Sequence, residues 1–269
     1  MSQTASPKVT THLDAGVYTI TLADPDNRNA LSRQLTSELM AAMDRVDTDG
    51  DIRVVVLTNE GTVFCAGADL SERSDDDRPD ANADESPEKL ESSDPLGFFG
   101  RIRRSPKPWV GKINGHAVAG GLGLAAATDI SVALDTAKMG FSEVRIGVAP
   151  AIISVICLPK MRASEASEAF LRGNRFPATE AARLGLVNYA VPANQVDAKV
   201  DEIVGDLVLG GPLALAASKQ LVNDVPHMPF DQAMAWTSTL SGSLFESDEG
   251  QEGMKSYLEK RTPRWVPKG

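Results

Sequence analysis

Two glycine-containing turns are the parts of this sequence best suited to chemistry. One is Phe64-Cys-Ala-Gly-Ala-Asp-Leu70, and the other lies within 114–130, where glycines at 115, 120, 121 and 123 lead into an alanine-rich helix. Glycine tolerates positive φ angles and close backbone approach, so such turns can present bare N–H groups to a negative charge. Glycines alone are more typical of tight helix–sheet packing. Two such turns, each following a predicted strand, could together hold one oxygen.

A single glutamate, Glu143, is the candidate acid/base group. It follows a predicted strand at 137–141, and a glutamate in that position is most often a solvated side chain. It could exchange protons near neutral pH if an apolar pocket raised its pKa. The residues that could line such a pocket are Val144, Ile146, Ile152 and Ile153.

Histidine and cysteine add no catalytic or metal-binding pattern to the sequence. His12, His116 and His227 are scattered, so we expect neither a catalytic triad nor a metal site, and His116 is interpreted as structural. The only cysteines are Cys65 and Cys157, which indicates no disulfide framework and no metal-ligand cluster.

Apolar periodicity predicts the elements that position these residues. The predicted strands are 9–13, 17–22, 53–58, 109–113, 130–134 and 137–141, the last two expected to pair. Tyr18, Ile20 and Leu22 share one strand face, and Asn29 or Ser32 can cap the helix that follows. Helical spacing recurs near 195–208, 212–222, 230–245 and 248–260. The β–α–β order predicts a layered α/β domain.

The chain is acidic, and its charge is unevenly distributed. Its 269 residues are 42% hydrophobic and 24% charged, with a net charge of −10. Segment 71–95 holds ten acidic and three basic residues and almost no large apolar side chain, so we interpret it as a mobile surface loop. No basic stripe indicates nucleic-acid binding. No apolar run is long enough for a membrane span, and residues 1–7 lack the apolar core of a signal peptide, so a cytoplasmic location is expected.

The sequence resembles the enoyl-CoA hydratase/isomerase (crotonase) superfamily nearly from end to end. The motifs that carry the resemblance are 27–32, 64–70, the second glycine turn, 141–150, 181–188 and 252–261. The resemblance implies a crotonase-like spiral of ββα units followed by a C-terminal helical region. We therefore expect an α/β core at 1–194 that carries the acidic segment, and a helical region at 195–269 that forms a homotrimer or a dimer of trimers.

The resemblance also implies an acyl-CoA substrate and an oxyanion site. The backbone N–H groups of Ala68 and Gly120 match the family's two donors, and Glu143 matches one of its two glutamates. The position of the other glutamate is Gly123, followed by Leu124, which resembles the methylglutaconyl-CoA-hydratase-like branch. No cofactor or metal is implied, because coenzyme A is part of the substrate.

Six further residues match the family's coenzyme A contacts. They are Arg28 for the phosphates, Ala66, Asp69 and Leu70 for the adenine end, and Tyr257 and Lys260, which some members offer to a neighbouring subunit's nucleotide. For the last two, ordinary helix packing and a solvated lysine remain an equal alternative.

Three functions remain open from the sequence. The leading one is an enoyl-CoA hydratase that adds water to a 2-enoyl thioester through an oxyanion hole and the single glutamate. An enoyl-CoA isomerase is the second, because one carboxylate can also move a proton between two carbons. The third is a non-catalytic homologue that binds acyl-CoA or RNA, and the acidic charge balance argues against RNA.

Overall fold

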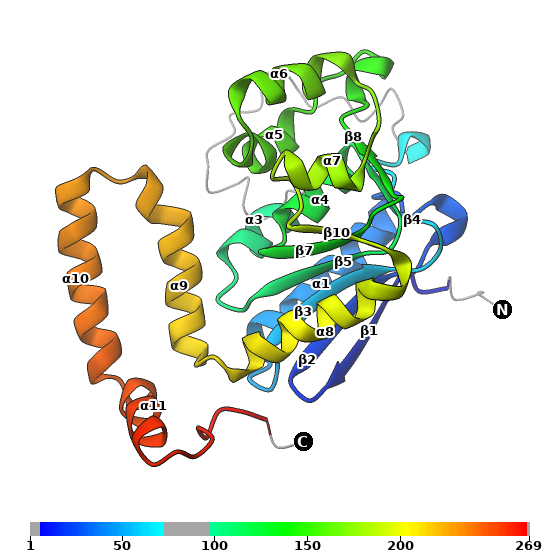
Figure 1. Ribbon diagram of the computed structural model, residues 1–269. Helices are drawn as coiled ribbons and strands as arrows, with labels where there is room; N and C mark the ends of the chain where they lie inside the picture. The colour runs from blue at the N-terminus through cyan, green and yellow to red at the C-terminus, as the bar shows by residue number, and fades with distance from the viewer. Residues whose placement is uncertain (1–5, 73–96, 268–269) are drawn as a thin grey trace.

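A six-stranded sheet forms the centre of the protein, as Figure 1 shows for the computed structural model, which describes residues 6–72 and 97–267. Its spatial order is β1 (Val9–Asp14), β2 (Val17–Leu22), β3 (Val54–Asn59), β5 (Trp109–Ile113), β7 (Ile130–Leu134) and β10 (Tyr189–Val191). β1 pairs antiparallel with β2, whereas β2, β3, β5, β7 and β10 run parallel to one another.

Helices cover both faces of this sheet, which explains why β3 is buried along its whole length. Alternate residues point to opposite faces. On one face, Val55 and Leu57 share a core with α1 (Arg33–Thr48), whose N-terminus is capped by the Ser32 hydroxyl. On the other face, valines of β3, β5 and β7 pack against Val196, Val200 and Ile203 of α8 (Ala193–Leu209).

A second, smaller sheet lies beyond the first and carries the glycine turns. Its order is β4 (Val63–Cys65), β6 (His116–Val118), β8 (Lys138–Gly140) and β9 (Phe176–Pro177), with β4, β6 and β8 parallel. The predicted pairing of 130–134 with 137–141 is wrong, because β7 belongs to the large sheet and β8 to the small one. Between them a turn, closed by a 2.9 Å bond from Ala137 N–H to Leu134 C=O, redirects the chain.

The same crossing occurs three times, which gives the ββα spiral that the resemblance implies. β3 continues into β4, β5 into β6, and β7 into β8, and a helix follows each short strand. The helices of this part are α3 (Phe98–Arg104), α4 (Gly120–Ala127), α5 (Ala151–Cys157), α6 (Ala163–Arg172) and α7 (Ala178–Arg183). Helix α4 is apolar all round, and Gly121–Ala127 are buried, so it forms the centre of the core.

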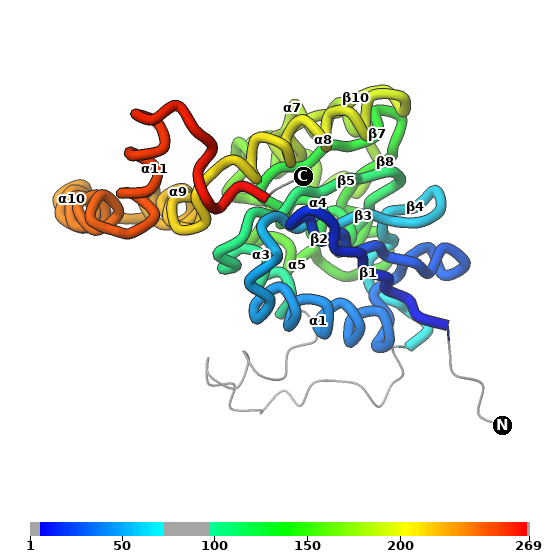
Figure 2. Tube along the Cα trace, turned by 90° about the horizontal axis from the view of Figure 1, so that it is seen from below, coloured from blue at the N-terminus to red at the C-terminus, as the bar shows by residue number. Residues whose placement is uncertain are grey.

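After α8, three helices form an arm that projects from the core (Figures 1 and 2). They are α9 (Pro212–Asp224), α10 (Phe230–Glu246) and α11 (Asp248–Leu258), close to the predicted ranges. No residue of α10 is buried against another part of the described chain. Because α8 packs on the sheet, the arm begins at residue 210, and the division into 1–194 and 195–269 stays a prediction.

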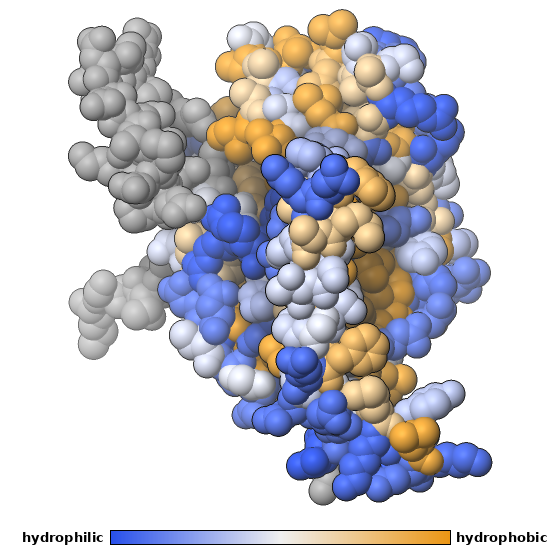
Figure 3. Space-filling model, turned by 90° about the vertical axis from the view of Figure 1, so that its left-hand side faces the viewer, coloured by the Kyte–Doolittle hydropathy of each residue, from blue (hydrophilic) through white to orange (hydrophobic). Residues whose placement is uncertain are grey.

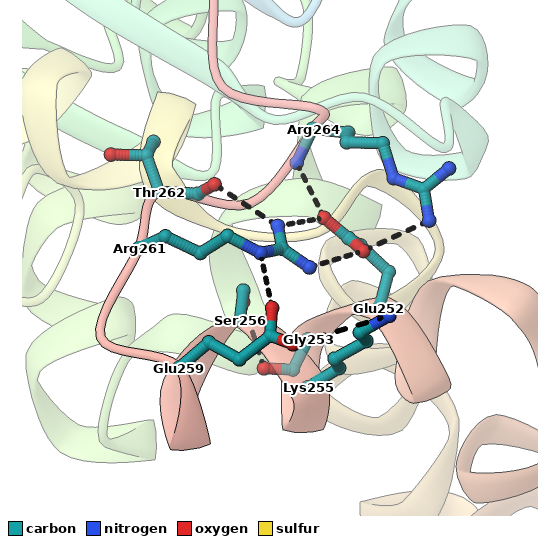
Figure 4. Close-up of polar contacts among 8 residues, drawn as sticks. All are labelled: Glu252, Gly253, Lys255, Ser256, Glu259, Arg261, Thr262 and Arg264. Atoms are coloured by element: carbon teal, nitrogen blue, oxygen red, sulfur yellow. Dashed lines mark hydrogen bonds and ion pairs between the residues drawn. The ribbon is translucent and has the colours of Figure 1, made fainter.

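The C-terminal tail returns from α11 to the base of the arm and is fixed by Glu252 (Figure 4). The buried Glu252 carboxylate accepts hydrogen bonds from the Arg261 guanidinium at 2.6 and 2.9 Å, and from the Arg264 backbone and side chain at 3.0 Å. The two arginines hold the pKa of Glu252 well below its ordinary value. The indole of Trp265 then donates to Leu209 C=O at 3.0 Å, which joins the tail to the end of α8.

Two sequence predictions concern the remaining parts of the chain. The acidic segment 71–95 lies outside the described residues except for Ser71 and Glu72, which end a short 3-10 turn. Within the described ranges, no helix is both long and apolar enough to cross a membrane.

Candidate active site

Three parallel strands of the small sheet end at the three candidate catalytic positions. β4 leads to Ala68, β6 leads to Gly120, and β8 leads to Glu143. β6 lies between the other two, pairing Ala117 with Cys65 on one side and Val118 with Gly140 on the other. The carboxyl ends of parallel strands meet at one edge of a sheet, where ligands of α/β proteins commonly bind. Residues 75 positions apart in sequence are therefore brought to a single edge.

The two glycine turns lie directly against each other. A Cβ atom placed on Gly67 would lie 2.9 Å from the Ala119 Cβ and 3.1 Å from the Gly120 nitrogen. A Cβ atom placed on Gly120 would lie 3.9 Å from the Ala68 nitrogen. A side chain at position 67 would force the turns apart, so the glycine there allows the Ala68 and Gly120 amides to lie so close.

The conformation of each turn is fixed by its neighbours. Gly67 has φ +87°, which favours glycine, and its carbonyl accepts a 2.8 Å hydrogen bond from the Leu31 amide. Ala119 has φ +51°, uncommon for a residue with a side chain, and its amide donates to Gly140 C=O at 2.9 Å. Neither the Ala68 amide nor the Gly120 amide donates to any atom of the described residues. Both are therefore available to a ligand.

Glu143 opens a short 3-10 helix, η4 (Glu143–Ile146), and its carboxyl group is partly buried. Its Oε2 is buried without a hydrogen-bond partner in the described chain. Burial raises the pKa of this carboxyl, opposed by a hydrogen bond from its own backbone amide. Of the four apolar residues expected around it, only Ile153 is buried, at 3% exposure, so the other three do not make the expected pocket.

Position 123, where the family resemblance places a second glutamate, is closed by packing. A Cβ atom on Gly123 would lie 2.1 Å from Cγ2 of Ile153 and 3.4 Å from Cε1 of Phe99. Helices α3, α4 and α5 thus meet at this glycine. The glutamate is absent, and the space for it is filled.

Four of the six candidate coenzyme A residues cluster at the β4 end of the same edge. The Ala66 amide donates to the Arg28 carbonyl at 3.1 Å, and the Asn27 side chain donates to the Asp69 carboxylate at 2.8 Å. Hydrogen bonds from Ser71 and Asn27 lower the pKa of Asp69. The side chains of Arg28 and Leu70 are exposed beside this cluster.

Tyr257 and Lys260 lie elsewhere, at the end of α11 on the arm. Figures 1 and 2 both place α11 away from β4 and β8. Tyr257 is 84% exposed, so its ring is not packed within its own chain. The structure therefore does not bring these two residues to the cluster around Arg28 in one chain.

Asn29 and Leu31 support the site, and the sequence did not indicate their roles. Asn29 was expected only as a possible cap of α1, and Leu31 was not expected at the site. The buried Asn29 side chain accepts from Asp24 N–H at 2.7 Å and donates to the carbonyls of Glu60 and Val63 at 3.0 and 2.7 Å. It therefore ties its own turn to the connection between β3 and β4 rather than capping α1. Cδ1 of Leu31 would lie 3.2 Å from a Gly120 Cβ atom. A polar residue within an otherwise ordinary turn was the available signal for Asn29.

His116 has the structural role that was predicted for it. Its Nδ1 accepts a 2.9 Å hydrogen bond from the Lys138 amide, joining the start of β6 to the start of β8. The histidine lies at the opposite end of these strands from Gly120 and Glu143.

The arrangement of the site allows two chemical tasks. The Ala68 and Gly120 amides could hold an anionic oxygen, and the partly buried Glu143 carboxyl could move a proton.

Comparisons with known proteins point to the same family that the sequence resembles. The enoyl-CoA hydratase/isomerase family model matches residues 12–268. The enoyl-CoA hydratase EchA19 of Mycobacterium tuberculosis is 32% identical over 249 residues, 91% of each chain. The 2,3-dehydroadipyl-CoA hydratase of Escherichia coli is 29% identical over 92% of this chain and 94% of its own. The crystal structure of an enoyl-CoA hydratase from Mycobacterium smegmatis, 29% identical, matches with a TM-score of 0.86 over 97% of this chain and 99% of that one.

The family model and the structural match both cover nearly the whole chain, including the ββα spiral. The chain belongs to the enoyl-CoA hydratase/isomerase family. Gly123 stands where the resemblance implies a second glutamate, and Ile153 and Phe99 pack around it.

Proposed function

We propose that this protein is an enoyl-CoA hydratase, which adds water across the double bond of a 2-enoyl-CoA thioester. The observation that carries the proposal is the meeting of three features at one sheet edge. These are the free Ala68 amide, the free Gly120 amide and the partly buried Glu143 carboxyl. The names of the relatives support the same reaction.

The reaction needs one acid/base group and one site for negative charge. The Glu143 carboxylate removes a proton from water as the water oxygen bonds to the β-carbon. The electrons of the double bond move to the thioester oxygen, where the Ala68 and Gly120 amides stabilise the enolate. The protonated Glu143 then gives a proton to the α-carbon, which restores both the thioester and the carboxylate. One preorganised donor contributes on the order of 3–4 kcal/mol to such a barrier.

The substrate carries its own coenzyme A, so the proposed reaction uses no metal or redox cofactor. The cluster of Arg28, Ala66, Asp69 and Leu70 at the β4 end of the edge would hold the nucleotide. The exposed Arg28 guanidinium suits a phosphate group, because it presents several donors and keeps its charge.

We also propose that the protein works as a homotrimer or a dimer of trimers in the cytoplasm. Apolar side chains are exposed along the arm, among them Phe230 at 77%. Figure 3 also shows apolar surface at the top of the molecule. A projecting arm with an unburied α10 suits packing on a second copy. Tyr257 and Lys260 would then reach a neighbour's nucleotide.

The proposed cytoplasmic location is supported by the cysteines. Cys65 and Cys157 are free, buried thiols, which suit a reducing compartment.

A panel of enoyl-CoA thioesters tests the proposed reaction. The purified protein is incubated with straight and branched 2-enoyl-CoAs, and loss of the conjugated thioester absorbance is followed, with saturated acyl-CoAs as controls. We expect absorbance loss with at least one unsaturated substrate and a 3-hydroxyacyl-CoA product by mass spectrometry. A product of unchanged mass with a moved double bond would instead identify an isomerase. No reaction with any member of the panel would contradict both enzyme functions.

A further inference from the structure

The turn that precedes α1 holds two consecutive residues in a left-handed conformation. Arg28 has φ +54° and Asn29 has φ +50°, and neither is a glycine. Residues with a side chain rarely adopt positive φ angles, although asparagine does so more readily than most. Two of them in a row persist only where the surrounding structure holds them, and such strain is concentrated at functional sites. We therefore looked for the contacts that fix the turn at 27–31.

The side chain of Asn29 fixes this turn from within. It is fully buried, and its Nδ2 group donates to the carbonyls of Glu60 at 3.0 Å and Val63 at 2.7 Å. Its Oδ1 accepts from the Asp24 amide at 2.7 Å. A carboxamide supplies two donors and an acceptor on a short side chain, which aliphatic and carboxylate side chains of this size do not. A different residue at position 29 would therefore remove a hydrogen bond from two carbonyls and one amide.

The backbone of the same turn is paired with the segment that carries one of the two candidate oxyanion donors. The Leu31 amide donates to the Gly67 carbonyl at 2.8 Å. Leu31 and Ala68 form a parallel β-bridge. Asn29 lies two residues before Leu31, so the hydrogen bonds of its side chain hold the Leu31 amide opposite Gly67.

The Gly67 carbonyl and the Ala68 N–H belong to one peptide group. A peptide group is planar, and no cis bond occurs in the described chain, so the carbonyl and the N–H point in opposite directions. The hydrogen bond from Leu31 on the carbonyl side therefore sets the direction of the Ala68 N–H on the other side. It also polarises this N–H, because hydrogen bonds in a chain strengthen one another.

The second donor is held by a different part of the chain. The Gly120 N–H shares its peptide group with the Ala119 carbonyl. This carbonyl accepts from the amides of Leu122 at 2.9 Å and Gly123 at 3.2 Å, in the first turn of α4. Helix α4 thus sets the direction of the Gly120 donor. Disturbing the turn at 27–31 should therefore act first on the other donor.

We propose that Asn29 is a positioning residue for the Ala68 donor, and that it acts through the Leu31 amide and the Gly67–Ala68 peptide group. Its role in catalysis rests on the function proposed above. Without the Asn29 side chain the strained turn relaxes, and the Leu31 amide leaves the Gly67 carbonyl. The Ala68 N–H then loses its fixed direction, so the oxyanion has one preorganised donor instead of two.

One NMR signal reports on this peptide group in the protein without ligand. Alanine follows glycine in the sequence only at Gly67–Ala68, so ¹³C-carbonyl glycine and ¹⁵N-alanine labels give a single peak in an HNCO spectrum. Asn29→Gly keeps the freedom to adopt a positive φ angle but removes the side-chain hydrogen bonds. We expect the carbonyl ¹³C resonance to move upfield, because the hydrogen bond to this carbonyl is lost. Asn188→Gly, which removes a 2.9 Å hydrogen bond from the Ser131 amide in the large sheet, is the matched control and should leave the peak in place.

Two further variants keep this test decisive. The α-hydroxy acid of leucine at position 31 forms an ester, so it removes the donor to Gly67, keeps the Asn29 contacts and shows how far the peak moves. If Asn29→Gly does not fold, Asn29→Asp gives the same comparison, because it keeps the acceptor for the Asp24 amide and loses the Nδ2 donors. A peak that stays in place in the folded Asn29 variant would overturn the proposal. An unmoved peak in the ester would overturn it too, since Leu31 would then not hold the carbonyl.

Turnover measurements separate this inference from the proposed function. If the wild type hydrates an enoyl-CoA, Asn29→Gly should lower kcat by up to about 10²–10³-fold, the effect of losing one such donor, with a smaller change in KM. The pH profile should keep its shape, because Glu143 is untouched, and Asn188→Gly should match the wild type. A wild-type kcat in an Asn29→Gly protein whose peak has moved would overturn the role in catalysis. If no enoyl-CoA is hydrated, the proposed function fails, and the carbonyl peak still decides whether Asn29 positions the Ala68 amide.

Discussion

Burial raises the pKa of the Glu143 carboxyl group, and its buried Oε2 has no hydrogen-bond partner among the described residues. Glu143→Gln keeps the shape of the side chain but can neither take nor release a proton. We expect this change to lower kcat by about 10²–10⁴-fold, toward the upper end because one group serves both transfers. Binding of acyl-CoA, measured by calorimetry, should stay nearly unchanged.

The matched control for this variant is Glu168→Gln, which removes an exposed carboxylate of α6 paired with Arg172. Its rate should equal that of the wild type. If Glu143→Gln keeps more than about a tenth of the wild-type rate, another residue supplies the proton. Asp69 is the first candidate to examine.

The raised pKa of Glu143 also has a cost in stability. Between its ordinary value of 4.5 and its raised folded value, the folded protein binds the proton more tightly than the unfolded chain does. The free energy of unfolding therefore falls as pH rises through this window and stays lower above it. Glu143→Gln removes the ionisation, so it should raise the thermal midpoint at pH 7 and have less effect at pH 4. A variant less stable than wild type at pH 7 would contradict this.

At the scale of residues, the sequence indicated which positions form the site but did not indicate which side chains contact them. Ala68, Gly120 and Glu143 could be proposed as site residues because their motifs are local, and the structure brings the three positions to one sheet edge. The contact of Ile153 with Gly123 could not be predicted, because it joins residues 30 positions apart through the crossing of α4 and α5. The prediction of a pocket around Glu143 was wrong for the same reason. Val144, Ile146 and Ile152 are exposed, and tertiary packing decides their exposure.

At the scale of elements, helix α4 depends on a glycine that brings it against β4. A Cβ atom on Gly121 would lie 2.1 Å from the Cys65 carbonyl oxygen, a backbone atom that cannot rotate away. Gly121→Ala should therefore lower the free energy of unfolding by about 1–3 kcal/mol or more. Urea denaturation measures the change.

The control for Gly121→Ala is Gly205→Ala in α8, where an added Cβ meets no atom within 4 Å. There alanine should stabilise the helix by about 1 kcal/mol. Opposite signs for the two substitutions would separate packing from helix propensity. Equal signs would show that α4 can shift away from β4.

Strands and helices were largely predictable, whereas their division between two sheets was not. Strands β7 and β8 both form within the predicted ranges 130–134 and 137–141, but nothing in the alternation of these residues indicates that a short turn sends them to different sheets. The hydrogen bonds that decide this join β8 to β6 and β9, elements distant in sequence. Local pattern fixes the type of an element, and non-local pairing fixes its place.

At the scale of the whole molecule, the arm exposes apolar surface that a second copy could cover. Phe230 begins α10 and is largely exposed. In a trimer built through the arm, Phe230→Glu should shift the molecular mass in light scattering from three chains toward one. Ser238→Glu, at an exposed position of the same helix, is the control and should leave the mass unchanged. A wild type that is monomeric at micromolar concentration would refute the assembly.

The anchoring of the arm joins parts of the chain that are far apart in sequence. Arg53, next to the start of β3, donates to Gly210 C=O at 2.8 Å and also to the Trp265 carbonyl. Closing loops of this length costs conformational entropy, and such long-range contacts slow folding. The sheet can therefore form before the arm is fixed to it. We expect amide hydrogens of the arm to exchange faster than those of the sheet in native-state hydrogen exchange.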